Sequence, residues 1–462
     1  MALELNLYFP NQTHITVSLI DANGREETKL LNFASPASGQ TDKHLRWYTE
    51  EYATQYSADL EHDNAQQIVK QLSVLGAALF DRVFKKRAAL QLFKKFNDSK
   101  EPNRVLTITT TNPAILALPW ELLHDSGKDG NFLSNKNISI RRRIYVANDK
   151  FFALNPRPKL HLLYVLSRPT NVSFTDPRAV AEVALQAINS TGRISVEFLR
   201  PATLKNLQAR LGNSQLPPVD ILHFDGHGIF DNNGQLGVEA RNDFQTMPLE
   251  LRQLLLELPI SENTSYLLFE KDNGEKQLVP ASLLANLFSR QPISLVILST
   301  PTQPVLASYP TQNMDGIAAL MAAMGVPFVL LISSSMLKPA TKQLFNKFYA
   351  SLAQGHNLGT ALDQARLTLL EDTERREVQQ FRERLKIHIF DWFVPILYQQ
   401  GLDTPLLTQG QIGISHSVAK TAGSNLPAPP ISGFFGRWQE LWQIEHWFRN
   451  GVRCVSINSF GG

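Results

Sequence analysis

Residues 219–228 read Val-Asp-Ile-Leu-His-Phe-Asp-Gly-His-Gly, and this stretch indicates the fold most clearly. An apolar run followed directly by glycines is typical of a buried strand that ends at a loop. The reactive groups of an open parallel sheet lie where its strands end. We therefore expect His227 to be a base at that edge, lined by Gly226 and Gly228, because glycine lets backbone approach a ligand closely. His223 lies within the strand, and we expect it to be packed beside the site.

Apolar runs of the same kind occur on both sides of this stretch, with helical patterns between them. Continuous apolar strands that alternate with helices indicate a parallel sheet covered on both faces. The sequence therefore predicts an α/β fold over residues 158–400, with a mostly parallel sheet and helices on both faces. Strands are expected at 160–166, 194–198, 219–224, 295–298 and 328–332, and helices at 180–188, 203–211, 344–352 and 358–369.

The segments outside this core carry further patterns. Asp63 is a candidate cap for a helix whose apolar stripe runs from Ile68 to Val83. Residues 371–386 are strongly charged and predict a solvated helical extension of the preceding helix. Additional strands are expected at 15–20, 105–108, 387–398 and 452–457.

Composition narrows the class of protein. The chain has 462 residues, with 45 Lys and Arg against 42 Asp and Glu, which gives a net charge of +3. This near balance gives no indication of a nucleic acid or a membrane as partner. The longest uncharged apolar stretch, 317–332, is too short to span a bilayer comfortably. The one cysteine, Cys454, permits no disulfide within the chain, so we expect a cytoplasmic protein in which this thiol is a small buried apolar group.

The histidine segment resembles the histidine motif of the CHAT family, caspase-like cysteine peptidases of the same clan as separases. The resemblance covers roughly residues 100–400 and implies a caspase-like fold. It assigns 1–157 to the N-terminal part of the CHAT region and 158–400 to its core. Further segments that resemble the family are 117–125, 266–270, 278–281, 325–327, 348–349 and 361–366.

The resemblance also implies where a nucleophile should stand. In such peptidases the histidine assists a cysteine thiolate at the end of the next apolar strand, and nearby backbone N–H groups stabilise the oxyanion. Here that strand is followed by Ser299, Thr300 and Pro301, and Pro301 takes the nucleophile position. Proline has neither a nucleophilic side-chain atom nor an N–H. We therefore expect a pseudo-peptidase whose degenerate site is lined by Ser299 and Thr300.

A second resemblance lies near the C-terminus. Residues 434–441 resemble the opening of STAND and related AAA-type NTPases, and 455–462 resemble the strand and first glycines of their phosphate-binding loop. We expect 401–430 to be a linker and 431–462 to be the truncated beginning of such a domain. Gly461 and Gly462 would form an incomplete nucleotide site without the Lys and Ser/Thr that bind phosphate and magnesium. This chain is thus expected to bind no cofactor, and ATP with magnesium only if a complete NTPase domain follows.

The sequence leaves three possible functions open. The first is a CHAT pseudo-peptidase module of a STAND-type signalling or defence protein, which recognises or assembles proteins or peptides and oligomerises through the NTPase region. The second is an active peptidase that uses the hydroxyl of Ser299, Thr300 or Thr302. The third is a metal site of His223 and His227, with Asp225 as the nearest third ligand, although their spacing suits a helix and the segment is expected to be a strand.

Overall fold

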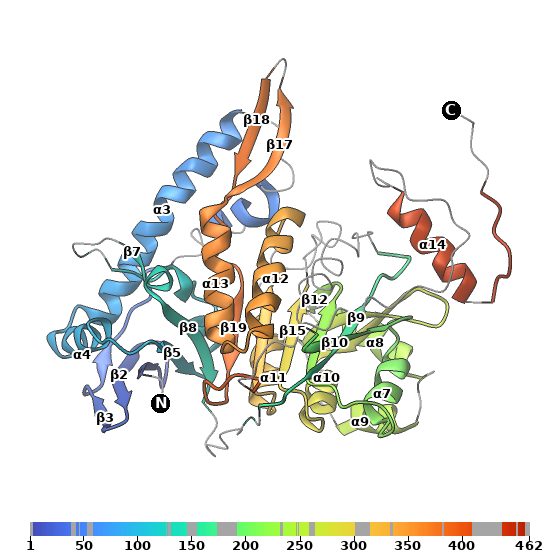
Figure 1. Ribbon diagram of the computed structural model, residues 1–462, viewed down its shortest axis with the longest axis horizontal. Coiled ribbons are helices and arrows are strands. Elements are labelled where there is room, and N and C mark those ends of the chain that lie inside the picture. The colour runs from blue at the N-terminus through green and yellow to red at the C-terminus, as the bar shows by residue number, and fades with distance from the viewer. Residues whose placement is uncertain are drawn as a thin grey trace.

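The computed structural model describes the chain in separate stretches (Figure 1). Several features expected from the sequence lie outside the described residues. They are the helix at 180–188, Pro301, Thr302, Gly461, Gly462 and most of the expected linker. The described residues are 3–37, 43–45, 47–52, 59–125, 127, 131–145, 154, 156–172, 192–231, 234–245, 247, 249–257, 264–300, 315–332, 336–380, 383–408, 437–449 and 451–457.

A twelve-stranded sheet forms the centre of the molecule, and its first half is parallel. Three strands of this half are buried along their whole length, as expected for strands covered on both faces: Ile221–Asp225, Leu295–Ser299 and Phe328–Ile332. The predicted mostly parallel sheet is therefore confirmed. The strands, in spatial order, are β10 (Ile194–Leu199), β9 (Leu160–Leu166), β11 (Ile221–Asp225), β15 (Leu295–Ser299) and β16 (Phe328–Ile332).

The second half of the sheet runs in the opposite direction. β19 (Ile396–Gln399) is antiparallel to β16, and it is followed by parallel β8 (Ile138–Ile144), β5 (Arg104–Thr110) and β1 (Leu3–Tyr8). Residues before 158 thus extend the same sheet. Its far edge is completed by antiparallel strands β2 (His14–Asp21), β3 (Gly24–Glu27) and β4 (Leu31–Asn32).

Helices cover both faces of the sheet, because alternate residues of each strand point to opposite cores. In β15, Leu295 and Ile297 join one core, whereas Val296 and Leu298 join the other. The first core is covered by α3 (Asp59–Phe84), α4 (Arg87–Asn97), α12 (Lys338–Ala353) and α13 (Leu358–Glu371). The second is covered by α7 (Leu204–Gly212), α8 (Gln235–Phe244), α9 (Leu249–Glu257), α10 (Ala281–Ser289) and α11 (Asp315–Ala323).

Smaller elements connect these layers. Three antiparallel strands form a second sheet directly after the histidine motif, and one short strand pair and several single turns of helix lie in the N-terminal half. The second sheet consists of β12 (Gly228–Asp231), β13 (Thr264–Glu270) and β14 (Lys276–Pro280). The others are β6 (His124–Asp125), β7 (Asn131–Phe132), η1 (Trp47–Tyr52), α5 (Pro113–Leu116), η2 (Trp120–Leu122) and η3 (Leu133–Lys136).

Two expectations about helices need correction. The stripe from Ile68 to Val83 is buried as predicted, but α3 begins at Asp59, so Asp63 is not its cap. Residues 371–386 are not a helical extension. They form a hairpin of β17 (Glu374–Gln380) and β18 (Glu383–His388), because Arg375 is buried against Asp391, with Nη2 2.9 Å from the carboxylate, and this contact requires the chain to leave the helix.

The C-terminal part also differs from the prediction. The helix α14 (Trp438–Arg449) is present, but the described residues 451–457 belong to no strand, and Cys454 is exposed rather than buried. A strand needs a neighbour to accept its hydrogen bonds, and no described strand pairs with this segment. Among the described helices, none is long and apolar enough to cross a bilayer.

Candidate functional site

The histidine loop, which we define as Gly226 and His227, joins β11 to β12 at the end of the parallel strands. Asp225 pairs with Ser299 across β11 and β15, and the Gly226 N–H donates to the Ser299 carbonyl over 3.2 Å. The Thr300 N–H in turn donates to the carbonyl of Ile332 over 3.2 Å. Backbone contacts therefore hold the histidine loop and the end of β15 together at one edge of the sheet.

Gly226 is confined by its surroundings. A Cβ atom at this position would lie 2.8 Å from the Phe224 ring and 3.1 Å from the Cβ of Ser167. Contacts under 3.0 Å require neighbouring atoms to move, and both neighbours are themselves buried. Only glycine lets the chain turn out of the sheet here without displacing the strand ends.

His227 is almost completely buried, with 2% of its surface exposed. Its carbonyl accepts the N–H of Leu268 over 2.9 Å, and Gly228 then pairs with Leu267. The second sheet thus begins at the histidine and fixes its backbone from one side, while Gly226 fixes it from the other. The backbone at His227 is therefore held between the two sheets.

A buried network of charged and polar side chains holds Asp225, the residue before the loop. Its carboxylate accepts a hydrogen bond from the Tyr164 hydroxyl over 2.9 Å and one from Nη2 of Arg168 over 2.7 Å. Nη1 of Arg168 donates to the Asp225 carbonyl over 2.7 Å. Burial, followed by the nearby carboxylate of Asp225, raises the pKa of Tyr164 well above its usual value. The network thus pairs the buried side chain of Asp225 with Arg168 and Tyr164.

Sequence reasoning missed Arg168 and Tyr164. The nearest available signal was the position of Arg168, two residues after the apolar run of β9, where charged side chains of parallel sheets gather. Its partner, Asp225, is 57 residues away along the chain, so no local pattern joins them.

His223 is packed in the core on the α12 face of the sheet, as the sequence predicts. Its Nδ1 lies 2.8 Å from the hydroxyl of Tyr349, and its ring centroid lies 4.5 Å from that of Tyr164 and 4.8 Å from that of Phe345. Burial lowers the pKa of His223 to about 4, although the charge of Asp225 opposes the shift. The imidazole is therefore neutral at physiological pH.

The metal hypothesis finds no further support in this arrangement. Asp225 is engaged by Arg168 and Tyr164, and one nitrogen of His223 is engaged by Tyr349. Within the described stretches there is no group of three His, Cys, Asp or Glu residues placed to hold an ion.

Two hydroxyl groups lie at the end of β15. Ser299 is 6% exposed and Thr300 is fully buried, and the Oγ1 atom of Thr300 has no hydrogen-bond partner among the described residues. Pro301 and Thr302 lie outside the described residues, so the position that should carry the nucleophile is known from the sequence alone.

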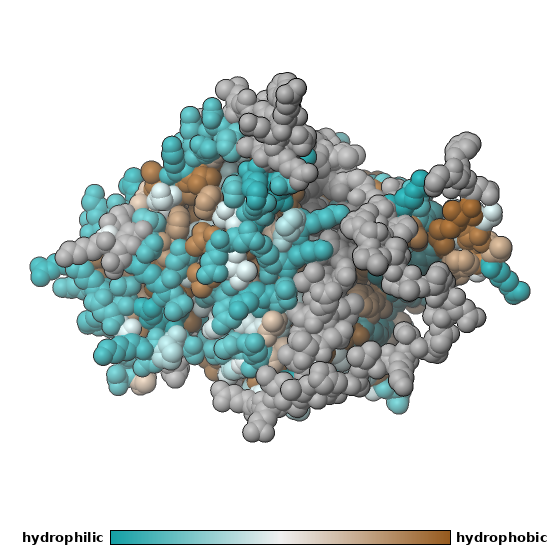
Figure 2. Space-filling view, turned by 45° about the horizontal axis from the view of Figure 1, so that its top comes forward, coloured by the Kyte–Doolittle hydropathy of each residue, from teal (hydrophilic) through white to brown (hydrophobic). Residues whose placement is uncertain are grey.

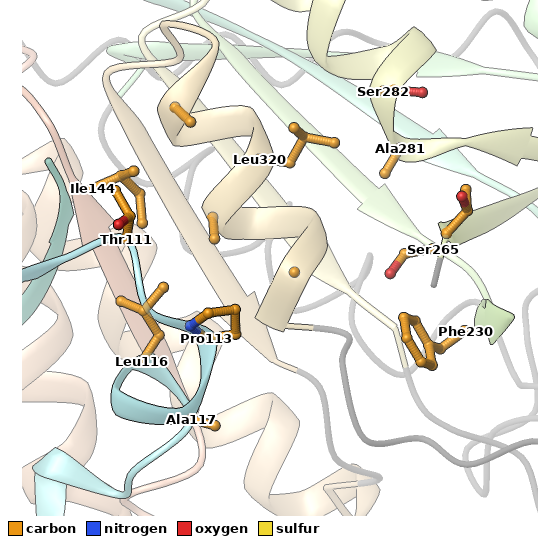
Figure 3. Close-up of a pocket in the computed structure, with 14 residues that line it drawn as sticks. Thr111, Pro113, Leu116, Ala117, Ile144, Phe230, Ser265, Ala281, Ser282 and Leu320 are labelled. Atoms are coloured by element: carbon orange, nitrogen blue, oxygen red, sulfur yellow. The ribbon is translucent and has the colours of Figure 1, made fainter. Parts of the chain in front are cut away.

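A separate apolar cavity of about 600 Å³ lies over α11 (Figure 3). Leu320 of α11 lies between two walls, one with Pro113 and Leu116 of α5, the other with Phe230 and Ser265 of β12 and β13. The α11 residues that line it are apolar, and all but one are small: Gly316, Ala319, Leu320 and Ala323. Sequence reasoning did not identify this cavity, because its walls come from segments far apart in the chain.

Comparison with known proteins finds two similar solved structures and one matching family model. Two crystal structures of the separase–securin complex of Saccharomyces cerevisiae, at 3.0 and 2.6 Å resolution, are similar to this chain, with TM-scores of 0.43 and 0.42 and 10% sequence identity. Each match covers 86% of this chain but only 30% of the chain in the complex. No curated protein matches the sequence. The family model described as "CHAT domain" matches residues 73–398, which is most of the sequence and includes both the histidine loop and β15. This chain therefore belongs to the CHAT domain family.

Proposed function

We propose that this CHAT domain is a pseudo-peptidase, which binds proteins or peptides and does not cleave them. The observation that carries the proposal is the absence of a usable thiol. The sequence has one cysteine, Cys454, which lies outside the family match and is exposed. A cysteine peptidase cannot act without a thiolate next to its base.

The residue at the nucleophile position supports the same conclusion. Pro301 follows the end of β15, and a proline supplies neither a nucleophile nor an N–H for an oxyanion. His227 could at most orient a water molecule there. One oriented water rarely suffices for amide hydrolysis without stabilisation of the oxyanion.

A peptidase that uses a hydroxyl group is the second candidate. The observation in its favour is the Thr300 hydroxyl, which has no hydrogen-bond partner within the described part of the chain and lies where β15 ends beside the histidine loop. Against it, Thr300 is fully buried and Ser299 nearly so, whereas a nucleophile must reach the carbonyl of a bound peptide. This candidate therefore requires a rearrangement of the end of β15.

We further propose that the CHAT domain works within a STAND-type signalling or defence protein in the cytoplasm. The support is the resemblance of residues 434–441 and 455–462 to the start of an NTPase domain. In this proposal 1–157 and 158–400 form the CHAT region, 401–430 is the linker, and 431–462 begins the NTPase domain. A complete domain of that kind would bind ATP with magnesium and provide the surface for oligomerisation.

Peptide cleavage tests the two candidates against each other. A peptide library is incubated with the wild-type chain, with His227→Ala, and with the triple variant Ser299→Ala/Thr300→Ala/Thr302→Ala. We expect the same background for all three proteins. Turnover by the wild type that both variants abolish would establish the hydroxyl peptidase instead.

A further inference from the structure

The C-terminal helix α14 is seated on the CHAT domain at the end of the edge strand β10. The Nη1 atom of Arg200 lies 3.0 and 3.2 Å from the two carboxylate oxygens of Glu445. The guanidinium carbon of Arg200 lies 4.9 Å from the ring centroid of Trp442 and 5.4 Å from that of Phe198. Arg200 is therefore bound by a charge and by an aromatic ring of α14, while a ring of its own strand supports it.

A second contact lies at the turn between β13 and β14. Gly274 has φ +83°, and a Cβ atom there would lie 2.7 Å from the ring of His446. The helix can approach this closely only because the turn residue is glycine. The Gly274 carbonyl accepts the N–H of Thr170 over 2.9 Å, so the turn is tied to the segment that follows β9.

A short series of residues connects the surface that α14 contacts to the histidine loop. Burial is the main cause that raises the pKa of Glu270, and the nearby charge of His446 is one of the influences that oppose it. The Glu270 carboxylate accepts the backbone N–H of Arg168 over 2.8 Å. Arg168 in turn binds the carboxylate and the carbonyl of Asp225, directly before the loop. The steps from Glu270 to Arg168 and from Arg168 to Asp225 are direct hydrogen bonds, and the turn at Gly274, which contacts α14, is joined by a hydrogen bond to Thr170, two residues after Arg168.

The contact surface is suited to reversible binding. The side chain of Arg200 is 23% exposed and that of Glu445 is 41% exposed, so water screens their ion pair. Trp442 of α14 packs against the hydrophobic core, whereas Trp447 and Phe448 remain exposed on the helix. In Figure 2 apolar side chains are visible at the end of the molecule that α14 occupies. One face of the helix is thus held weakly and the other stays accessible.

We propose that Phe198, Arg200 and Gly274 form a docking site that holds α14 reversibly, and that docking of α14 stabilises the histidine loop. The state of the segment after the CHAT domain would then be transmitted to the candidate site through Glu270 and Arg168. The two-state element is the helix, docked or released, and both sites act on its equilibrium. The proposal concerns the conformation of the loop and holds whether or not the loop catalyses a reaction.

Hydrogen exchange in the complete 462-residue chain tests the docking site. The variants Glu445→Ala and Trp442→Ala lie on α14, so they leave the sheet intact, and Arg200→Glu reverses the charge of the surface itself. We expect amide exchange in 438–449 to rise on the order of tenfold in each variant, because a released helix loses its tertiary protection. The double variant Arg200→Glu/Glu445→Arg should restore part of the protection, and Lys95→Ala, which breaks an exposed ion pair elsewhere, should change nothing.

The same samples test transmission to the loop. The amides of Gly226 and Leu268, which donate to Ser299 and His227, should exchange faster whenever 438–449 does. If α14 keeps its protection in all single variants, the docking site is wrong. If α14 is released while these two amides keep wild-type rates, the coupling to the histidine loop is wrong. A failure of peptide cleavage has no bearing on either result, so this proposal and the proposed function can fail separately.

Discussion

The histidine loop and the end of β15 lie at the same edge of the sheet, yet they are held in different ways. Asp225 is bound by Arg168 and Tyr164, and Gly226 is enclosed by packed side chains. At the end of β15, by contrast, the buried hydroxyl of Thr300 makes no hydrogen bond to any described residue, and the next residue is a proline. One side of the site is held by buried polar contacts, and the other carries only the buried hydroxyls of Ser299 and Thr300 before the proline.

This comparison distinguishes the residues of such a site that stabilise the fold from those that are needed only for the reaction. A buried ion pair cannot lose one partner without leaving a charge unpaired, so the network around Asp225 is under constraint even without catalysis. A nucleophile has no such structural role and can be lost at little cost to stability. A domain can therefore keep the histidine side of a peptidase after it has lost the cysteine.

The largest effect is expected when the network is broken. Asp225→Ala leaves the guanidinium of Arg168 buried without its carboxylate, and we expect a loss of about 3–5 kcal/mol in the free energy of unfolding. Denaturant unfolding followed by circular dichroism measures it. Glu26→Ala, which removes an exposed partner of Lys95, is the control and should cost less than about 1 kcal/mol. Equal losses in the two variants would mean that the network does not hold the site.

The next prediction concerns His223, the histidine packed within β11, and how it makes the free energy of unfolding depend on pH. Burial lowers the pKa of His223 to about 4 in the folded protein, whereas an unfolded histidine titrates near 6.5. The unfolded state therefore binds more protons between these values, and stability falls as pH decreases from about 6.5 towards 4. We expect this one residue to account for a loss of up to about 3 kcal/mol.

The variant His223→Phe isolates that contribution. It also loses the hydrogen bond to Tyr349, so its stability is lower at pH 7, but its decline between pH 6.5 and 4 should be shallower than that of the wild type. Identical slopes for both proteins would show that His223 is already charged or is accessible to water.

Substitutions at two glycines are expected to change the stability less, and one of the two serves as the reference for the other. Gly226→Ala places a methyl group 2.8 Å from the Phe224 ring, and we expect it to cost about 1–3 kcal/mol. Gly212→Ala, at the end of α7 with open space around its Cβ, should be neutral or stabilising by up to about 1 kcal/mol. Thermal unfolding of both variants provides the comparison, and similar melting temperatures would contradict the confinement of the loop.

The features that the sequence predicted correctly are those determined by patterns among residues that are neighbours in the chain. The apolar runs of β9, β11, β15 and β16 sufficed for the parallel half of the sheet, and the glycines around His227 sufficed to place it after a strand. The hairpin at 374–388 was misread because its charged residues fit a solvated helix as well. What decides between the two is the distant partner of Arg375.

Long-range contacts explain the other omissions in the same way. The pair of Arg168 and Asp225 joins two strand ends, and the cavity over α11 has walls from six separate segments. The contact surface of α14 joins Arg200 to Glu445 across 245 residues. None of these has a periodic pattern. They follow only from the order of strands in the sheet, which local patterns leave open.

The central claim is that the site has lost its nucleophile while it has kept its histidine side, and restoring a thiol tests this most directly. Pro301→Cys is made in a Cys454→Ser background, because Cys454 is exposed and would react by itself. Alkylation by iodoacetamide is then followed between pH 5.5 and 9, with and without His227→Ala. A thiol beside an intact histidine should titrate with a pKa about 1–2 units below the ordinary value near 8.5, and His227→Ala should return it to that value. A thiol at position 301 that titrates near 8.5 in both proteins would contradict the account.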